Sequence, residues 1–183
     1  MKKRGRTGSS IADVPALAPD TFDDPLEGSP TLEQVGEQLS RAFHVSPHEV
    51  ALYRLERGFL RFLLPTELKT AGAIPLSSSA VSAHTAYSKK VELFNNFIKV
   101  KHASVFENVK LGDKDHPGET VPIQKMLSAP ILDEPGDVLG VVQICRKGAD
   151  VSCGPDFSMD DLQRLEQAAK VLAQAPFMQP SSD

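Results

Sequence analysis

Apolar residues recur at helical spacing near the beginning and near the end of this chain. The first stripe follows Ser29 and Thr31, either of which can cap a helix, and the second follows Ser158. The members of the two stripes are Leu32, Val35, Leu39 and Ala42, and Leu162, Leu165, Ala169 and Leu172. The pattern predicts two amphipathic helices that enclose the rest of the ordered chain.

Between these helices the pattern changes to apolar runs that are typical of strands. The predicted strands are 50–55, 59–64, 73–76, 127–132 and 138–145. Gly58 can take the positive φ of a tight hairpin turn, and Pro75 restricts its strand to a sheet edge. A further helix is predicted at 80–90, capped by Ser77, Ser78 or Ser79, and residues 91–120 have an irregular pattern.

These elements predict one α+β domain with a tail at each end. Residues 1–28 lack a sustained periodicity and are expected to form a flexible tail. Residues 29–175 form the predicted domain, and 176–183 are a short tail.

The composition narrows the classes of function. The chain of 183 residues is 40% hydrophobic and 24% charged, with a net charge of −4, which gives no support to binding of nucleic acid or anionic membrane. Lys2, Lys3, Arg4 and Arg6 are followed by acidic residues that offset them. No segment approaches the ~20 apolar residues of a membrane helix, so we expect a cytoplasmic protein.

The sequence also indicates no catalytic or metal site. Cys145 and Cys153 match no zinc spacing, and the histidines form no helical metal pair. Glycine-rich phosphate loops and nucleophile motifs are absent from the sequence. We therefore expect a protein that is not an enzyme; a cofactor cannot be assigned.

Residues 124–172 resemble the C-terminal half of a GAF domain, a fold of the same group as profilin and PAS domains, and the order of elements over about 30–174 resembles the whole domain. The resemblance implies a central antiparallel sheet, with the first and last helices on one face and the 91–120 connection on the other. The resemblance depends on 128–131 (Ser-Ala-Pro-Ile), on 138–143 (Val-Leu-Gly-Val-Val-Gln), and on Phe157 and Ser158 with Asp161 and Leu162. Gly140 would permit a close backbone approach within its strand. Cyclic-nucleotide GAF domains carry Asn-Lys and Asp-Glu where this chain has Arg146-Lys147 and Asp161-Leu162, so the resemblance does not extend to cyclic-nucleotide binding.

The resemblance implies a free-standing bacterial GAF domain that binds a small molecule and signals through a partner or by dimerisation. The terminal helices would form the homodimer, unless their apolar stripes are used fully on the sheet. One alternative is an interaction scaffold with a collapsed pocket. A second is an enzyme resembling the free methionine-(R)-sulfoxide reductases, whose clustered cysteines this chain does not reproduce.

The resemblance also implies positions for site residues. The ligand would contact the covering segment and the sheet beneath it, at Phe62, Asn95, Asn96, Phe97, His102, Ser104, Phe106 and Ser128. Alternatively, Asn95 and Asn96 cap loop backbone and His102 satisfies a buried carbonyl. Lys147, Phe157 and Asp161 would have structural roles, with Lys147 pairing with Asp161 to tie the last strand to the last helix.

Among polar residues on the predicted strands, Arg61, Ser128 and Gln143 face either solvent or the pocket. The alternation of polar and apolar positions favours solvent for all three.

Overall fold

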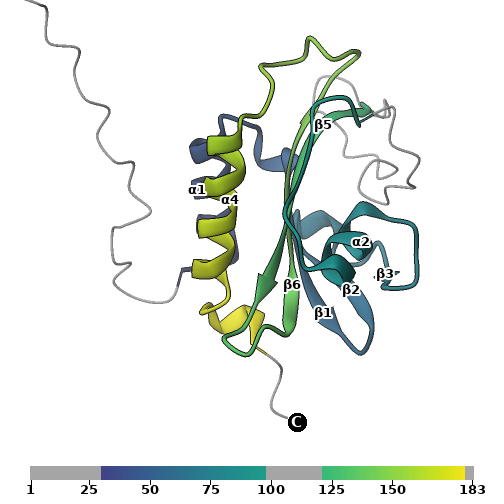
Figure 1. The fold of residues 1–183 in the computed structure, drawn as a ribbon, viewed down its shortest axis with the longest axis vertical. Helices are drawn as coiled ribbons and strands as arrows, with labels where there is room; N and C mark the ends of the chain where they lie inside the picture. The colour runs from purple at the N-terminus through teal and green to yellow at the C-terminus, as the bar shows by residue number, and fades with distance from the viewer. Residues whose placement is uncertain (1–29, 98–120, 180–183) are drawn as a thin grey trace, which may run out of the picture.

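The computed structural model describes residues 30–97 and 121–179, and these form three layers around one sheet. Helices α1 (Leu32–Phe43) and α4 (Met159–Leu172) lie side by side on one face, and α2 (Val81–Ser88) covers the other (Figure 1). The expected tail at 1–28 and most of the 91–120 connection lie outside the described residues.

The sheet has six strands in the order β3-β2-β1-β6-β5-β4, and every neighbouring pair is antiparallel. The strands are β1 (Val50–Glu56), β2 (Phe59–Leu64), β3 (Ala73–Pro75), β4 (Glu92–Phe94), β5 (Ile123–Leu132) and β6 (Val138–Lys147). Short 3₁₀ turns occupy Pro47–Glu49, Thr66–Leu68 and Pro176–Met178. The expected α+β architecture with a central antiparallel sheet is confirmed.

Local sequence accounts for the hairpins and the terminal helices. Arg57 and Gly58 both have positive φ, as a two-residue hairpin turn requires. The side chains of Thr31 and Ser158 each accept a hydrogen bond from the backbone N–H three residues later, in a complete capping box. Pro75 lies on the outermost strand, β3, as predicted.

Two sequence predictions in the middle of the chain are wrong. Residues 92–94, expected to be irregular, form β4 because they pair with Met126, Leu127 and Ser128 of β5. Helix α2 begins after Ala80, which has no capping side chain, whereas a serine cap was predicted. The three residues of β4 are too few to show a periodicity in the sequence, so pairing with β5 determines that they form a strand.

The sheet buries a separate apolar cluster on each face. The α1–α4 face contains the two predicted stripes, with Leu39 and Leu165 fully buried. The apolar stripes of α1 and α4 therefore pack against the sheet. This is the arrangement expected if the stripes do not form a dimer surface. On the α2 face the second cluster surrounds Tyr53, Phe62 and Met126. Within the described residues, no helix is long and apolar enough to cross a membrane.

Candidate functional site

Four polar side chains lie buried among the apolar residues of the α2 face. Tyr53 of β1, Ser128 of β5, Gln143 of β6 and Thr85 of α2 are each at most 2% exposed. The expectation that Ser128 and Gln143 face solvent is therefore wrong, because α2 covers this part of the sheet. Arg61 is exposed as expected, and its guanidinium lies 3.0 Å from the Glu56 carboxylate.

These side chains form a continuous series of hydrogen bonds. The Tyr53 hydroxyl donates to Gln143 Oε1 at 3.1 Å, and Gln143 Nε2 donates to Ser128 Oγ at 3.1 Å. Ser128 Oγ lies 2.7 Å from Thr85 Oγ1, which in turn lies 2.8 Å from Glu92 Oε2. We call Tyr53, Gln143, Ser128, Thr85 and Glu92 the polar row.

All hydrogen bonds of the polar row run in one direction. Thr85 has one hydroxyl proton, and it donates this proton to the Glu92 carboxylate. Ser128 must therefore donate to Thr85, since the contact between the two hydroxyls needs one donor. The row begins at a buried phenol and ends at a carboxylate near the surface, where His84 Nδ1 lies 3.0 Å from Glu92 Oε1.

The inner end of the polar row stays uncharged. Burial raises the pKa of Tyr53 far above its ordinary range, and the neighbouring Cys145 raises it further. The phenol therefore keeps its proton and remains a donor at every physiological pH. Tyr53, Gln143, Ser128 and Thr85 together offer neutral hydrogen-bonding groups rather than a nucleophile with a general base.

Aromatic and aliphatic residues surround the row. The Tyr53 and Phe62 rings are 4.6 Å apart between centroids, and Phe94 meets Phe97 edge-on at 6.0 Å. Phe62 and Phe97 are both 2% exposed. A few convergent polar groups in an apolar, aromatic surround are typical of small-molecule sites.

The structure brings together some of the predicted ligand-binding residues. Phe62, Phe97 and Ser128 are buried on the α2 face, whereas Asn96 is exposed. His102, Ser104 and Phe106 lie outside the described residues. Tyr53, Thr85 and Glu92 were missed; a threonine among the small apolar residues of α2 was the available signal.

Asn95 is engaged at a different place. Its side-chain amide donates to the Phe157 carbonyl at 3.0 Å, and its Oδ1 accepts from the Phe157 N–H at 2.8 Å. Both polar atoms of Asn95 are thus used on backbone, as the alternative interpretation of this residue expects. The pair joins the end of β4 to the segment that precedes α4.

Lys147 and Asp161, which were predicted to pair, each contact other groups in the structure. Asp161 instead accepts from the Ser158 N–H and hydroxyl at 2.8 and 3.0 Å, as part of the α4 cap. The Lys147 ammonium donates to the His48 carbonyl at 3.4 Å. The tie between the sheet and the α4 segment is made by Lys125, whose buried ammonium lies 2.8 Å from the Asp156 carboxylate.

Arg146 adds a second tie to the same segment. Its guanidinium carbon lies 4.5 Å from the centroid of the buried Phe157 ring. The same guanidinium donates to the Phe43 and His44 carbonyls at the C-terminus of α1. Phe157 is thus held between the sheet and the C-terminus of α1 by partners that the sequence did not indicate.

A double-mutant cycle on Lys147→Ala and Asp161→Ala should give a coupling energy close to zero. Asp161→Ala alone is expected to cost about 1 kcal/mol of unfolding free energy, because it removes half of the α4 capping box. Urea denaturation of the four proteins measures both quantities. A coupling energy of about 1 kcal/mol would show that the two side chains do interact.

Comparison with known proteins agrees with this geometry. The family model of the GAF domain matches residues 29–175. No curated protein matches the chain significantly in sequence. Similar solved structures include the GAF domain of a phosphoenolpyruvate-protein phosphotransferase from Acinetobacter, with 16% identity, a TM-score of 0.56 and coverage of 78% of this chain and 77% of that one.

Two further structures have the same fold. The corresponding GAF domain from Coxiella burnetii has 11% identity and a TM-score of 0.55, again covering 78% and 77% of the two chains. The GAF domain of a two-component sensor histidine kinase from Bacillus halodurans has 19% identity and a TM-score of 0.51, covering 78% and 91%. From the family match over most of its length and from this shared fold, the chain belongs to the GAF domain family.

Proposed function

We propose that this GAF domain is a non-catalytic regulatory module that binds a small, neutral, polar molecule on the α2 face. The proposal is based on the polar row, because its buried members are uncharged. These members are Tyr53, Gln143, Ser128 and Thr85. A ligand with an amide, hydroxyl or heterocyclic edge could replace one of these hydrogen bonds at little cost. Ligands of this kind exchange one satisfied hydrogen bond for another.

A ligand at this face would act on the orientation of α2. Thr85 attaches the helix to β5 and β4 at once, through Ser128 and Glu92. Inserting a ligand between Thr85 and Ser128 would separate α2 from the sheet while the row stayed satisfied. The shift in conformation is limited by the difference in ligand affinity between the two states.

The two cysteines support the non-catalytic part of the proposal. Cys145 is buried, and its Sγ donates to the Glu49 carbonyl at 3.3 Å. Cys153 is exposed in the segment after β6. A buried thiol that is hydrogen-bonded to a carbonyl is a structural group rather than a thiolate nucleophile.

A second function, an interaction scaffold with a closed pocket, has its own support. Each member of the polar row has a partner within the protein, and the surrounding cluster is almost wholly buried. A face that is satisfied and packed in this way needs no ligand. Dimerisation then becomes the output, and it would use the outer surfaces of the terminal helices, where Met159 and Val171 are exposed.

Native mass spectrometry of protein purified gently from cells tests the two functions. The sensor predicts an added mass that is lost on denaturation and that is absent from Gln143→Leu, which interrupts the row at its centre. We expect about tenfold weaker binding for each neutral hydrogen bond lost. Gln163→Leu, on the exposed side of α4, is the matched control and should retain the ligand.

The spectrum also distinguishes the alternatives. An added mass retained by Gln143→Leu would place the ligand away from the polar row. A clean mass for the wild-type protein, together with a dimer peak, would favour the scaffold. A monomer by light scattering at high micromolar concentration would remove dimerisation as the output.

A further inference from the structure

A groove of about 560 Å³ opens at the edge of the sheet, away from the polar row. It lies before the start of β4, where β5 continues past Ser128 without an outer neighbour, since Ser128 pairs with Glu92, the first residue of β4. The residues that line it are Lys89, Lys90, Val91, Pro130, Leu132, Asp133, Glu166, Ala169 and Lys170. Its volume is within the range of small-molecule sites.

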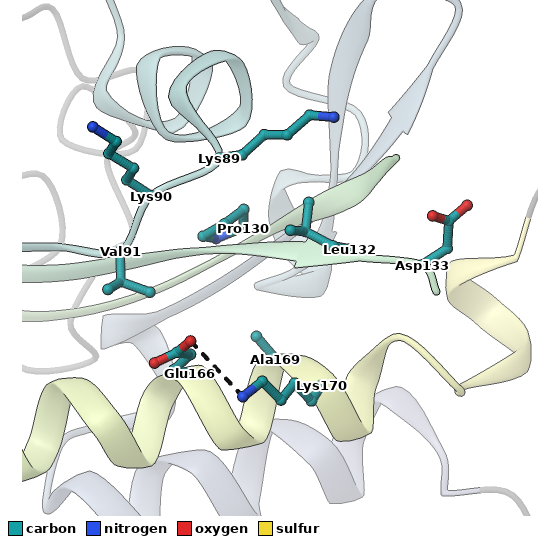
Figure 2. Close-up of a pocket in the computed structure, with 9 residues that line it drawn as sticks. All are labelled: Lys89, Lys90, Val91, Pro130, Leu132, Asp133, Glu166, Ala169 and Lys170. Carbon is teal, nitrogen blue, oxygen red and sulfur yellow. Dashed lines mark ion pairs between the residues drawn. The ribbon is translucent and has the colours of Figure 1, made fainter. Parts of the chain in front are cut away.

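The groove has two banks and an apolar floor. Figure 2 shows the linker between α2 and β4 on one side, α4 on the other, and Pro130 and Leu132 of β5 between them. Val91 and Ala169 extend the apolar surface toward each bank. An apolar body of several carbon atoms could lie along this floor and be removed from water.

Both banks are held in place by interactions outside the groove. His84 and Thr85 attach α2 to Glu92, which fixes the two ends of the Lys89–Lys90–Val91 linker. Lys89 Nζ donates to the Gly136 carbonyl at 2.7 Å and ties the linker to the β5–β6 hairpin. The opposite bank is the middle of α4. The groove therefore exists before a ligand arrives.

The charges at the rim favour an anion. The lining carries three ammonium groups (Lys89, Lys90 and Lys170) and two carboxylates, of which Asp133 already accepts a hydrogen bond from the Asp137 N–H at 2.7 Å. Lys170 lies 3.8 Å from Glu166, a distance that leaves the ammonium donors largely to solvent. Lys90 has no ion pair with another residue of the described ranges.

A compact ligand fits this edge better than an added peptide strand. Pro130 has no N–H to donate to a new strand. The register of β5 against β6 also shifts between Ile131 and Leu132. Both features interrupt the row of backbone groups that strand addition requires.

We propose that this groove binds a small carboxylate with an aliphatic or aromatic body. The body lies on Val91, Pro130, Leu132 and Ala169, and the carboxylate lies at the rim between Lys90 and Lys170. The ligand would thereby join the α2–β4 linker to α4, and so connect the two faces of the sheet. This site is separate from the α2 face and does not depend on the proposed function.

Octanoate is a suitable probe. Octanamide and acetate separate the contribution of its carboxylate charge from that of its apolar body. Amide chemical shifts in ¹H–¹⁵N NMR spectra of the full chain should move at Val91, Leu132 and Ala169 as octanoate is added. Octanamide, which lacks the charge, and acetate, which lacks the body, should each bind several-fold more weakly. Amides of Thr85 and Ser128 report on the α2 face in the same spectra.

The double variant Lys90→Ala with Lys170→Ala should weaken octanoate binding about tenfold, since each exposed charge contributes modestly. Both lysines are exposed, so the fold is expected to persist. Lys69→Ala removes an exposed lysine of the β2–β3 connection and is the matched control. It should leave octanoate affinity unchanged.

Three outcomes would overturn the proposal. Octanoate could bind no better than acetate and octanamide, or the double variant could bind it as well as Lys69→Ala does. The shifts could also be confined to Thr85, Ser128 and their neighbours, which would support the α2 face and remove the groove. Shifts confined to the groove, with none on the α2 face, would support this site whatever the outcome for the polar row.

Discussion

Gly140→Ala is expected to lower the free energy of unfolding by about 3 kcal/mol. A Cβ at this position of β6 would lie 2.0 Å from the Tyr53 carbonyl oxygen and 2.6 Å from Met178 Cε. Met178 could move its flexible end, but the Tyr53 carbonyl belongs to the backbone of β1, a central strand of the sheet. The clash must therefore shift the strand itself.

The same substitution should also disturb the polar row, because Tyr53 is its first member. Urea denaturation measures the stability, and the Tyr53 ring signals in NMR spectra report the local change. Gly36→Ala is the matched control: its Cβ would lie 3.4 Å from Leu64 Cδ1, an ordinary contact. Since Gly36 is inside α1, we expect alanine there to be neutral or to stabilise by up to about 1 kcal/mol.

An equal loss of stability in the two glycine variants would contradict this account. So would a Gly140→Ala protein as stable as the wild type. The second result would mean that β1 and β6 can separate without cost at Tyr53.

Phe157→Ala is expected to cost about 3–5 kcal/mol, because it removes a buried aromatic ring from the α1–α4 cluster. The ring also lies against the Arg146 guanidinium, which caps the last carbonyls of α1. Its loss should loosen α1 and α4 together. Hydrogen exchange of the amides of α1, compared with those of β2, would detect the effect on α1.

Two related variants separate the contributions at this position. Phe157→Leu keeps most of the apolar volume and loses the cation–π contact, so a cost of about 1 kcal/mol is expected. Asn95→Ala removes both hydrogen bonds to the Phe157 backbone and should cost about 1–3 kcal/mol. If Phe157→Ala were no worse than Phe157→Leu, packing of the ring would contribute little.

The contact between Asn95 and Phe157 bears on the regulatory role that we propose. Asn95 follows β4, while Phe97, two residues later, is buried in the cluster of the α2 face. Phe157 precedes α4 and belongs to the cluster on the opposite face. The Asn95–Phe157 pair is thus a short physical connection from the proposed ligand face to a terminal helix.

The resemblance predicted the family and the fold correctly. Phe157 is buried, and the sheet is joined to the segment before α4 by Lys125 with Asp156 and by Arg146 on Phe157. The burial of Lys125 could not be predicted from the sequence, because a lysine near the start of a strand is normally solvated. Only the packing of the segment before α4 over β5 buries it.

The sequence by itself determined the elements whose signals are local. Thr31 and Ser158 cap their helices, Gly58 turns the first hairpin, and two helical stripes predict the amphipathic helices. Each of these signals lies within a few residues and depends on backbone geometry or on period alone. The tertiary structure decided which polar groups are buried.

Ser128 and Gln143 alternate with apolar neighbours, as solvent-facing residues of a strand also do. They are buried because α2, which is distant in the sequence, covers them. β4 exists for the same reason, since three residues become a strand only beside β5. The groove beside it depends on where β4 begins and on how α4 lies across the sheet. Such features arise from contacts between segments far apart in sequence, and no local pattern encodes them.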